Sequence, residues 1–192
     1  PPLYPARHPG RFVSTVRTGD PSGCRVALLG LPDDTGIKMN AGRAGASAGP
    51  AAFRAALARV GVDRPAGFEW PAVYDAGDIL AAATLEETHD RVSEASAALH
   101  ALGLIPIAIG GGHDLTYAFV RGLVPKLDRP VVVYCDAHLD VRETPGSGMP
   151  FRWLREQCGV NEFHVHGLDP YGNTAEHLNW FQANGGRLDP FG

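Results

Sequence analysis

The chain has 192 residues and a formal net charge of −4, with 17 lysines and arginines against 21 aspartates and glutamates. Apolar residues make up 44% of the chain and charged residues 20%, a composition typical of globular domains that excludes a disordered or fibrous protein. The acidic balance gives no reason to expect nucleic acid or an anionic membrane surface as a partner.

Chain length, apolar segments and cysteines narrow the class further. A chain of this length can build one domain with a substantial core but not two large ones. No apolar run approaches the roughly 20 residues that cross a bilayer, and the N-terminal segment lacks a signal-peptide core, so we expect a cytoplasmic protein. Cys24, Cys135 and Cys158 show no C-x-x-C spacing, so neither a disulfide framework nor a zinc ribbon is expected.

The first quarter of the chain reads as an arm, a strand and a long loop. Residues 1–23 are rich in Pro, Gly and Arg, which predicts an irregular arm on the surface or on a neighbouring subunit. Residues 24–192 are expected to form a single α/β domain. It begins with a strand at 25–30, whose continuous apolar character is typical of a parallel strand covered on both faces. Residues 31–49 predict a long loop without regular structure, which itself suggests function, before a helix at about 50–60.

The next segments alternate between strand and helix. Residues 73–79 predict a strand and turn that carry Asp75 and Asp78, and we expect these acids to cap or position rather than to bind metal. A capping box that begins at Thr84 predicts the start of a helix with apolar residues at helical spacing. His89 on this helix has no partner at i+4 suited to a metal, so a packing or surface role is expected.

A glycine-rich turn follows the next predicted strand. Residues 104–109 predict a buried strand, and Gly110-Gly-Gly-His-Asp114 comes directly after it. Three glycines allow the backbone to turn sharply and leave His113 above the strand end. A phosphate cradle is the alternative interpretation, but the Lys-Ser/Thr pair that completes such a loop is missing.

The strand at 131–135 ends in Asp136, His138 and Asp140. Alternate side chains of an extended segment project to one side, so these three are expected to converge. Carboxylates with an imidazole suit Mn²⁺ or a similar ion, whereas a structural zinc site more often shows clustered cysteines. An exposed Asp-rich turn is the alternative. Because open α/β sheets place their active sites at the carboxyl ends of strands, we expect His113 to join this cluster.

The remaining segments continue the alternation. A helix at 150–157, a strand at 162–167 and a last helix capped by Asn173 are expected. His164 and His166 share one face of that strand; we expect a structural role for them, with extra ligands or proton carriers as the alternative. The pattern predicts an α/β protein with three layers and parallel crossovers.

The His113 and Asp136 segments resemble the first two metal-binding motifs of the ureohydrolase family, which includes arginase, agmatinase and formimidoylglutamase. The loop at 31–49 and Asp75-Ala-Gly-Asp78 also look like family landmarks. The resemblance extends from about residue 25 onward and implies an arginase-like α/β/α fold with a mainly parallel sheet. Ser147, where agmatinases carry a His, and Arg142, two residues after Asp140, favour formimidoylglutamase within the family.

The resemblance also implies a site and a reaction. Asp136, His138 and Asp140 would be catalytic, and together with His113 they would bind two Mn²⁺ ions per subunit. Asp136 would bridge both ions, His113 and Asp140 would hold one, and His138 the other. The reaction implied is hydrolysis of a C–N bond at an amidine carbon by activated water, with N-formimidoyl-L-glutamate giving L-glutamate and formamide in histidine degradation.

Three further residues would bind this small-molecule substrate, and a homo-oligomer, a trimer or hexamer, is implied. They are Arg142, Ser147 and Asn173; the planar guanidinium of Arg142 matches a substrate carboxylate. Agmatinase- or arginase-type hydrolysis of a guanidino substrate stays open as an alternative.

One family motif has no counterpart here. Family members carry a third segment with paired aspartates, and residues 167–192 contain only the single acids Asp169 and Asp189 next to prolines, apart from Glu176. We therefore expect a C-terminally incomplete fold, from a fragment or a natural short form, with an incomplete second metal site. A non-catalytic metal-binding or oligomerising homologue is the resulting alternative.

Overall fold

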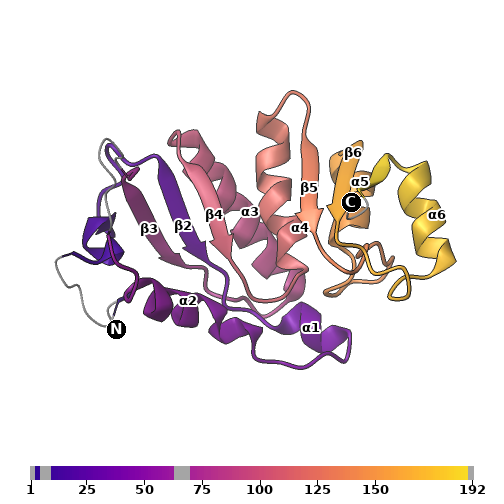
Figure 1. The fold of residues 1–192 in the computed structure, drawn as a ribbon, viewed down its shortest axis with the longest axis horizontal. Coiled ribbons are helices and arrows are strands. Elements are labelled where there is room, and N and C mark those ends of the chain that lie inside the picture. Colours follow the sequence, from indigo (N-terminus) through magenta and orange to yellow (C-terminus); the bar gives the residue numbers. More distant parts are fainter. Residues whose placement is uncertain (1–2, 5–9, 63–69, 190–192) are drawn as a thin grey trace.

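The computed structural model describes residues 3–4, 10–62 and 70–189, in which parallel strands alternate with helices (Figure 1). The strands are β1 (Val16–Arg17), β2 (Val26–Gly30), β3 (Val73–Asp78), β4 (Ile105–Ile109), β5 (Val131–Cys135), β6 (Glu162–His166) and β7 (Gly186–Asp189). The α-helices are α1 (Thr35–Met39), α2 (Gly49–Leu57), α3 (Leu85–Ala101), α4 (Leu115–Leu123), α5 (Pro150–Cys158) and α6 (Ala175–Ala183). Short 3-10 helices are η1 (Phe12–Thr15), η2 (Ala46–Ala48) and η3 (Val124–Lys126).

The strands form two parallel sheets instead of the one sheet expected. The first has the order β1-β3-β2-β4 and the second the order β5-β6-β7. In Figure 1, β4 and β5 are the facing edges of these sheets, their arrows run in the same direction, and α4 is drawn between them. The carboxyl ends of all these strands therefore lie along one side of the molecule, which confirms the mainly parallel α/β fold.

One core joins the two sheets through the helical layer on a common face. It contains buried Leu29 of β2, Val92 of α3, Leu115 of α4 and Phe163 of β6. A second, smaller cluster covers the opposite face of the first sheet, where Leu28 packs with half-buried side chains of α2. Strand β2 is consequently covered on both faces, as its apolar sequence predicts.

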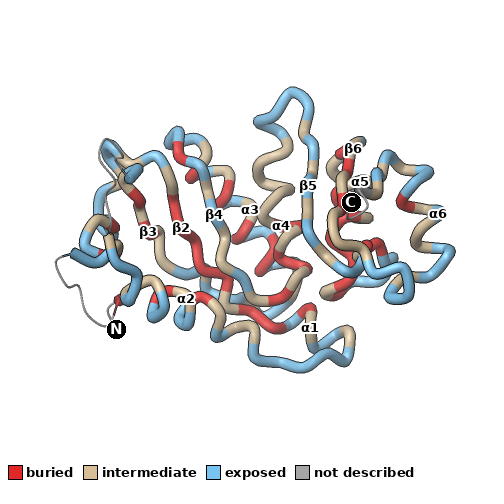
Figure 2. The backbone as a smooth tube through the Cα atoms, viewed as in Figure 1, coloured by how far each residue is buried: buried red, intermediate tan, exposed pale blue. Residues whose placement is uncertain are grey.

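Strands β4 and β5 were expected to be buried and are covered on one face only. Ile107 is 43% exposed and Val133 is 62% exposed, whereas their chain neighbours Ala108 and Val132 pack against the main core. Figure 2 shows pale blue, exposed stretches along both strands. Helix α2 contacts β4, but it leaves Ile107 exposed, and Ile107 and Val133 on this second face are therefore in contact with solvent.

Two segments expected to be irregular contain regular structure. Val16 in the N-terminal arm pairs with Val73 in β3 and is buried, so this part of the arm adds a strand to the chain's own sheet. The expected loop at 31–49 contains α1 and η2. Asp33 Oδ1 accepts the Thr35 N–H at 2.7 Å, and this side-chain turn initiates α1.

The longest helix begins as expected. The Thr84 hydroxyl oxygen accepts the Glu87 N–H at 3.2 Å, which is half of a capping box. No helix within the described residues is long and apolar enough to cross a membrane.

Candidate metal site

The turn between β4 and α4 carries the first predicted ligand, His113. The Gly112 N–H donates to Asp33 O at 2.8 Å, so this turn lies directly against the segment that follows β2. A Cβ atom added at Gly111 would lie 2.2 Å from Leu31 O and 2.5 Å from Asp33 O, which leaves room for glycine alone. The glycines therefore allow two backbone segments to approach closely, and His113 emerges at the carboxyl edge of the first sheet.

The turn after β5 brings two acids to the same place. His113 Nδ1 lies 2.7 Å from Asp140 Oδ2 and 3.8 Å from Asp136 Oδ2. One ligand atom from each of these three residues lies within 4.8 Å of the other two. Asp140 has a left-handed backbone (φ 47°), an uncommon conformation for a residue other than glycine, and this conformation is part of the turn that brings its carboxylate to His113.

The two carboxylates set the electrostatics of the cluster. Burial alone lowers the pKa of His113, but the hydrogen bond and negative charge of Asp140, together with the charge of Asp136, outweigh it. The pKa of His113 is therefore raised. A site that stabilises positive charge on an imidazole in this way also favours a bound cation.

His138, the fourth predicted ligand, lies beside the cluster rather than in it. Its Nδ1 is 3.5 Å from Asp136 Oδ1, its side chain is 59% exposed, and its backbone N–H donates to the same oxygen at 2.9 Å. The structure thus brings three of the four predicted residues together and leaves the fourth within reach of Asp136.

The donor set fits one manganese ion well. An imidazole and two carboxylates are ligands that Mn²⁺ accepts. A second divalent ion beside the first would have only these two carboxylates, Asp136 and Asp140, to offset four positive charges among the residues grouped here. The donor chemistry of these residues therefore suits one ion better than two.

The predicted substrate residues separate into two groups. A cavity of about 100 Å³ adjoins the cluster and contains Arg142 and Asn173 in its lining. Ser147 is not part of that lining. Its hydroxyl lies 3.0 Å from the side-chain amide of Asn40, and its N–H donates to Gly36 O at 3.0 Å, so Ser147 connects its loop to the α1 region.

Asn173 has a different position from the one expected in the last helix. The N-cap of α6 is Thr174, whose hydroxyl oxygen accepts the His177 N–H at 3.2 Å. The prediction of Asn173 as the N-cap of α6 is therefore wrong by one residue. Asn and Thr are both good cap residues, and here they are adjacent in sequence. His177, not predicted as a site residue, also lines the cavity.

Two groups of side-chain contacts were not predicted. The Arg54 guanidinium in α2 binds both carboxylate oxygens of Asp75 at 2.8 Å and Asp78 at 2.5 Å. The two acids therefore position a helix, as expected, but their partner was missed. His89 Nε2 lies 2.9 Å from Asp114 Oδ2, and both side chains are buried next to the metal cluster. His89 is thus buried, the first of the two expected alternatives, and its contact with Asp114 was not predicted.

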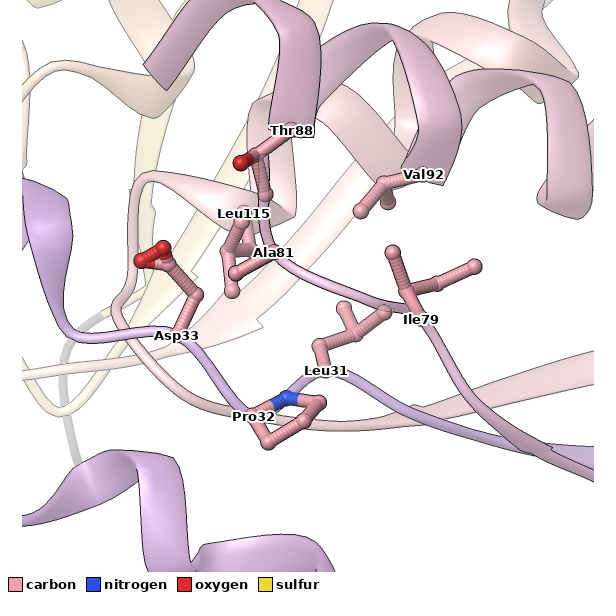
Figure 3. A pocket seen from close by; sticks show the side chains of 8 residues that line it. All are labelled: Leu31, Pro32, Asp33, Ile79, Ala81, Thr88, Val92 and Leu115. Atoms are coloured by element: carbon pink, nitrogen blue, oxygen red, sulfur yellow. The ribbon is translucent and has the colours of Figure 1, made fainter. Parts of the chain in front are cut away.

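Two other features lie apart from the cluster. His164 contacts Glu162 at 3.1 Å and does not belong to the metal-binding group found among the described residues. A small hollow under the loop after β2 has no room for a water molecule, so it is a packing space rather than a binding site (Figure 3). Its lining consists of Leu31, Pro32, Asp33, Ile79, Ala81, Thr88, Val92 and Leu115.

A sequence model of the arginase family matches residues 24–183. The chain belongs to the arginase family. The formimidoylglutamase of Aromatoleum aromaticum is 37% identical to it over 78% of this chain and 49% of that protein. The formimidoylglutamase of Ralstonia nicotianae is 38% identical over 85% of this chain and 54% of that protein.

Solved structures show the same likeness. The formiminoglutamase of Trypanosoma cruzi with Mn²⁺ has a TM-score of 0.83 and 33% identity, over 93% of this chain and 64% of that chain. The proclavaminate amidino hydrolase of Streptomyces clavuligerus has a TM-score of 0.75 and 27% identity, over 99% of this chain and 65% of that chain. The chain thus spans about half the length of the curated relatives it matches and about two thirds of these solved chains.

Proposed function

We propose that this chain carries the first metal-binding half of a manganese-dependent hydrolase, which cleaves a C–N bond at an amidine carbon of N-formimidoyl-L-glutamate. Water is consumed, and L-glutamate and formamide are the products. The observation that carries this proposal is the cluster of His113, Asp136 and Asp140 after the carboxyl ends of β4 and β5. The formimidoylglutamases among its relatives support the choice of substrate.

The residues of this chain have distinct roles in the proposal. His113, Asp136 and Asp140 would hold one ion, and His138, whose Nδ1 lies 3.5 Å from Asp136 Oδ1, would hold the other. Manganese in this site supplies the Lewis acidity that makes water nucleophilic near neutral pH. Arg142 lines the adjoining cavity, where its guanidinium can bind a substrate carboxylate through two parallel hydrogen bonds.

Further parts of the proposal come from the family resemblance. They are two ions per subunit, a homo-oligomer and a place in histidine degradation. A cytoplasmic location is proposed in addition. Two other functions compete with the main one. A guanidino substrate is supported by the likeness to proclavaminate amidino hydrolase, and a non-catalytic metal-binding role by the shortage of carboxylates for a second ion.

Metal loading followed by a substrate panel tests the proposal. We expect the chain to bind at least about one Mn²⁺ per subunit and Asp136→Asn to weaken that binding at least 100-fold, because it removes one of two charged ligands. Asp128→Asn, in the exposed segment before β5, is the matched control and should change affinity less than about 2-fold.

The loaded protein is then assayed with formimidoylglutamate, agmatine and arginine. Formamide release from formimidoylglutamate alone supports the proposed substrate. Urea release from agmatine or arginine transfers the chain to the guanidino class, and manganese binding without turnover of any substrate supports the non-catalytic alternative.

A further inference from the structure

Arg142 brings a positive charge to the cavity beside the metal cluster. The residue is exposed and lines that cavity together with Asp140. Among the described residues, none forms a hydrogen bond or an ion pair with its guanidinium. The guanidinium is therefore available to a carboxylate from outside the chain, which it can bind through two parallel hydrogen bonds. A long exposed side chain loses much rotamer freedom when it binds, so contacts that direct it beforehand favour binding.

Gly148 lies directly against the Arg142 side chain. The Arg142 N–H donates to Gly148 O at 2.8 Å, so the two residues are paired across a short loop. A Cβ atom added at Gly148 would lie 2.9 Å from Arg142 Cδ and 3.1 Å from its Nε. The optimal separation of two carbon atoms is about 3.5 to 4.0 Å, so this Cβ would push the arginine aside. The Arg142 side chain can lie across this position because residue 148 has no side chain.

Asn40, the residue after α1, holds the glycine in place. Its side-chain amide lies 3.0 Å from the Ser147 hydroxyl. In the orientation of the amide that satisfies its neighbours, its oxygen accepts the Ser147 and Gly148 N–H groups, each at 3.0 Å. A Cβ atom added at Gly146 would collide with the same amide, so the loop packs closely on Asn40. The loop is thus attached to the end of α1 by contacts that do not involve the arginine.

We propose that Gly148 is a positioning residue for substrate recognition, which directs the Arg142 side chain so that its guanidinium meets a substrate carboxylate. Gly148 is not part of the cavity lining, so it acts through the arginine, and Asn40 supports it by holding the loop. This role rests on the proposed function, because it assumes a substrate with a carboxylate, but it does not depend on the number of bound metal ions.

Binding of L-glutamate to the manganese-loaded full chain tests this role. L-glutamate is the proposed product, so its binding needs no turnover, and titration calorimetry measures its affinity. We expect Arg142→Met, which keeps part of the aliphatic stem without the charge, to weaken binding about 10-fold or more. Gly148→Ala should weaken it at least about 5-fold, because the added methyl group displaces the arginine. In the Arg142→Met background, Gly148→Ala should have no further effect, because the group that it positions is gone.

Two further measurements separate positioning from a general structural effect. The Mn²⁺ affinity of Gly148→Ala should stay within about 2-fold of the wild type, because the added methyl group meets a flexible side chain rather than the ligand turn. Gly19→Ala is the matched control: this glycine is exposed, and an added Cβ meets no atom within 4 Å, so L-glutamate affinity should change less than about 2-fold.

A second variant approaches the same loop from the other side. Asn40→Ala leaves Gly148 intact and removes the amide that holds it. We expect this variant to weaken L-glutamate binding as well, and again only when the Arg142 guanidinium is present. If Gly148→Ala fails to fold, Asn40→Ala takes its place in the same cycle.

The outcomes separate the positioning role from the proposed reaction. Equal loss of L-glutamate affinity from Gly148→Ala with and without the Arg142 guanidinium, or no loss in the wild-type background, overturns the positioning role. A wild-type chain that does not bind L-glutamate overturns it as well. Coupled loss of L-glutamate binding in a chain that does not hydrolyse formimidoylglutamate supports the positioning role and rejects the proposed reaction. Hydrolysis with a KM that Gly148→Ala leaves unchanged supports the reaction and overturns the positioning role.

Discussion

At the scale of single residues, the Asp114 carboxylate beside His113 is held in an unusual environment. One of its oxygens contacts His89, and the other is buried without a hydrogen-bond partner among the described residues. A Cβ added at Gly36 would lie 2.0 Å from this second oxygen, and one at Gly112 would lie 2.3 Å from it. The carboxylate is therefore enclosed by α1, α3 and the ligand turn, with a single polar contact to offset its desolvation.

Removal of that contact should be costly. We expect His89→Ala to lower the free energy of unfolding by about 3 to 5 kcal/mol, because it leaves a buried carboxylate without its partner and also creates a cavity. Urea denaturation of the metal-free chain measures the change. His100→Ala, on the same helix but only partly buried, is the control and should cost less than about 1 kcal/mol. Equal effects of the two substitutions would contradict the importance of the contact between His89 and Asp114.

Residue-level chemistry was only partly predictable from sequence. The spacing of Asp136 and Asp140 predicted that both carboxylates lie in one turn, but it did not predict that His138 lies beside the cluster rather than in it. His89 and Asp114 are 25 positions apart on different helices, and their contact depends on how α3 packs against α4. No local pattern carries that information.

At the scale of elements, Arg54 ties α2 to the carboxyl end of β3. Its side chain is 5% exposed and binds Asp75, whose side chain is fully buried and also accepts the Tyr4 hydroxyl at 2.6 Å. Burial alone raises the pKa of Asp75, but the hydrogen bonds from Arg54, Tyr4 and Gly77 outweigh it, so the pKa is lowered from its ordinary value of 3.8. A lowered pKa in the folded state means that the ionised carboxylate stabilises the fold.

The pH dependence follows from the sign of this shift. The stability that Asp75 contributes is fully present above its ordinary pKa of 3.8 and is lost as the pH falls through the lower pKa of the folded state. We expect Arg54→Met to cost about 3 to 5 kcal/mol at pH 7 and progressively less as the pH falls below that ordinary value. Chemical denaturation across this pH range provides the measurement, with exposed Arg59→Met as the control. A cost independent of pH would refute the assignment to Asp75.

Helices and strands were predicted correctly where the local sequence periodicity defines them. They were missed where they depend on pairing with residues far away in the sequence. The long helix α3 has a cap and an apolar stripe, so its start was evident. Strand β1 has only two residues, and its existence depends on pairing with β3 more than fifty positions later. Helix α1 has five residues, and side-chain turns at Asp33 define it more than apolar spacing does.

At the scale of the whole molecule, the uncovered faces of β4 and β5 are the dominant feature. Ile105 is 60% exposed and Val131 is 49% exposed, in addition to Ile107 and Val133 on the same strands. Exposed apolar strands at open sheet edges are templates for self-association. The sequence predicted the strands. Their exposure depends on which other elements pack against them, and the sequence of one strand does not show this.

Charge on these faces should therefore improve solution behaviour. We expect the double variant Ile107→Lys and Val133→Lys to bind at least about 2-fold less of a hydrophobic dye and to remain monodisperse at higher concentration, as measured by fluorescence and light scattering. Val132→Lys is the control: its side chain packs against the core, so it should unfold the chain rather than solubilise it. A double variant that aggregates as strongly as the wild type would show that association uses another surface.

The two ligand turns belong to different sheets. His113 follows the last strand of one, and Asp136 and Asp140 follow the first strand of the other. A cation bound by all three would link the two sheets, so its binding free energy would also stabilise the folded chain. At one hundred times its dissociation constant, such a ligand adds about 2.7 kcal/mol. The stability of the fold and the occupancy of the metal site would then both increase with the concentration of the metal.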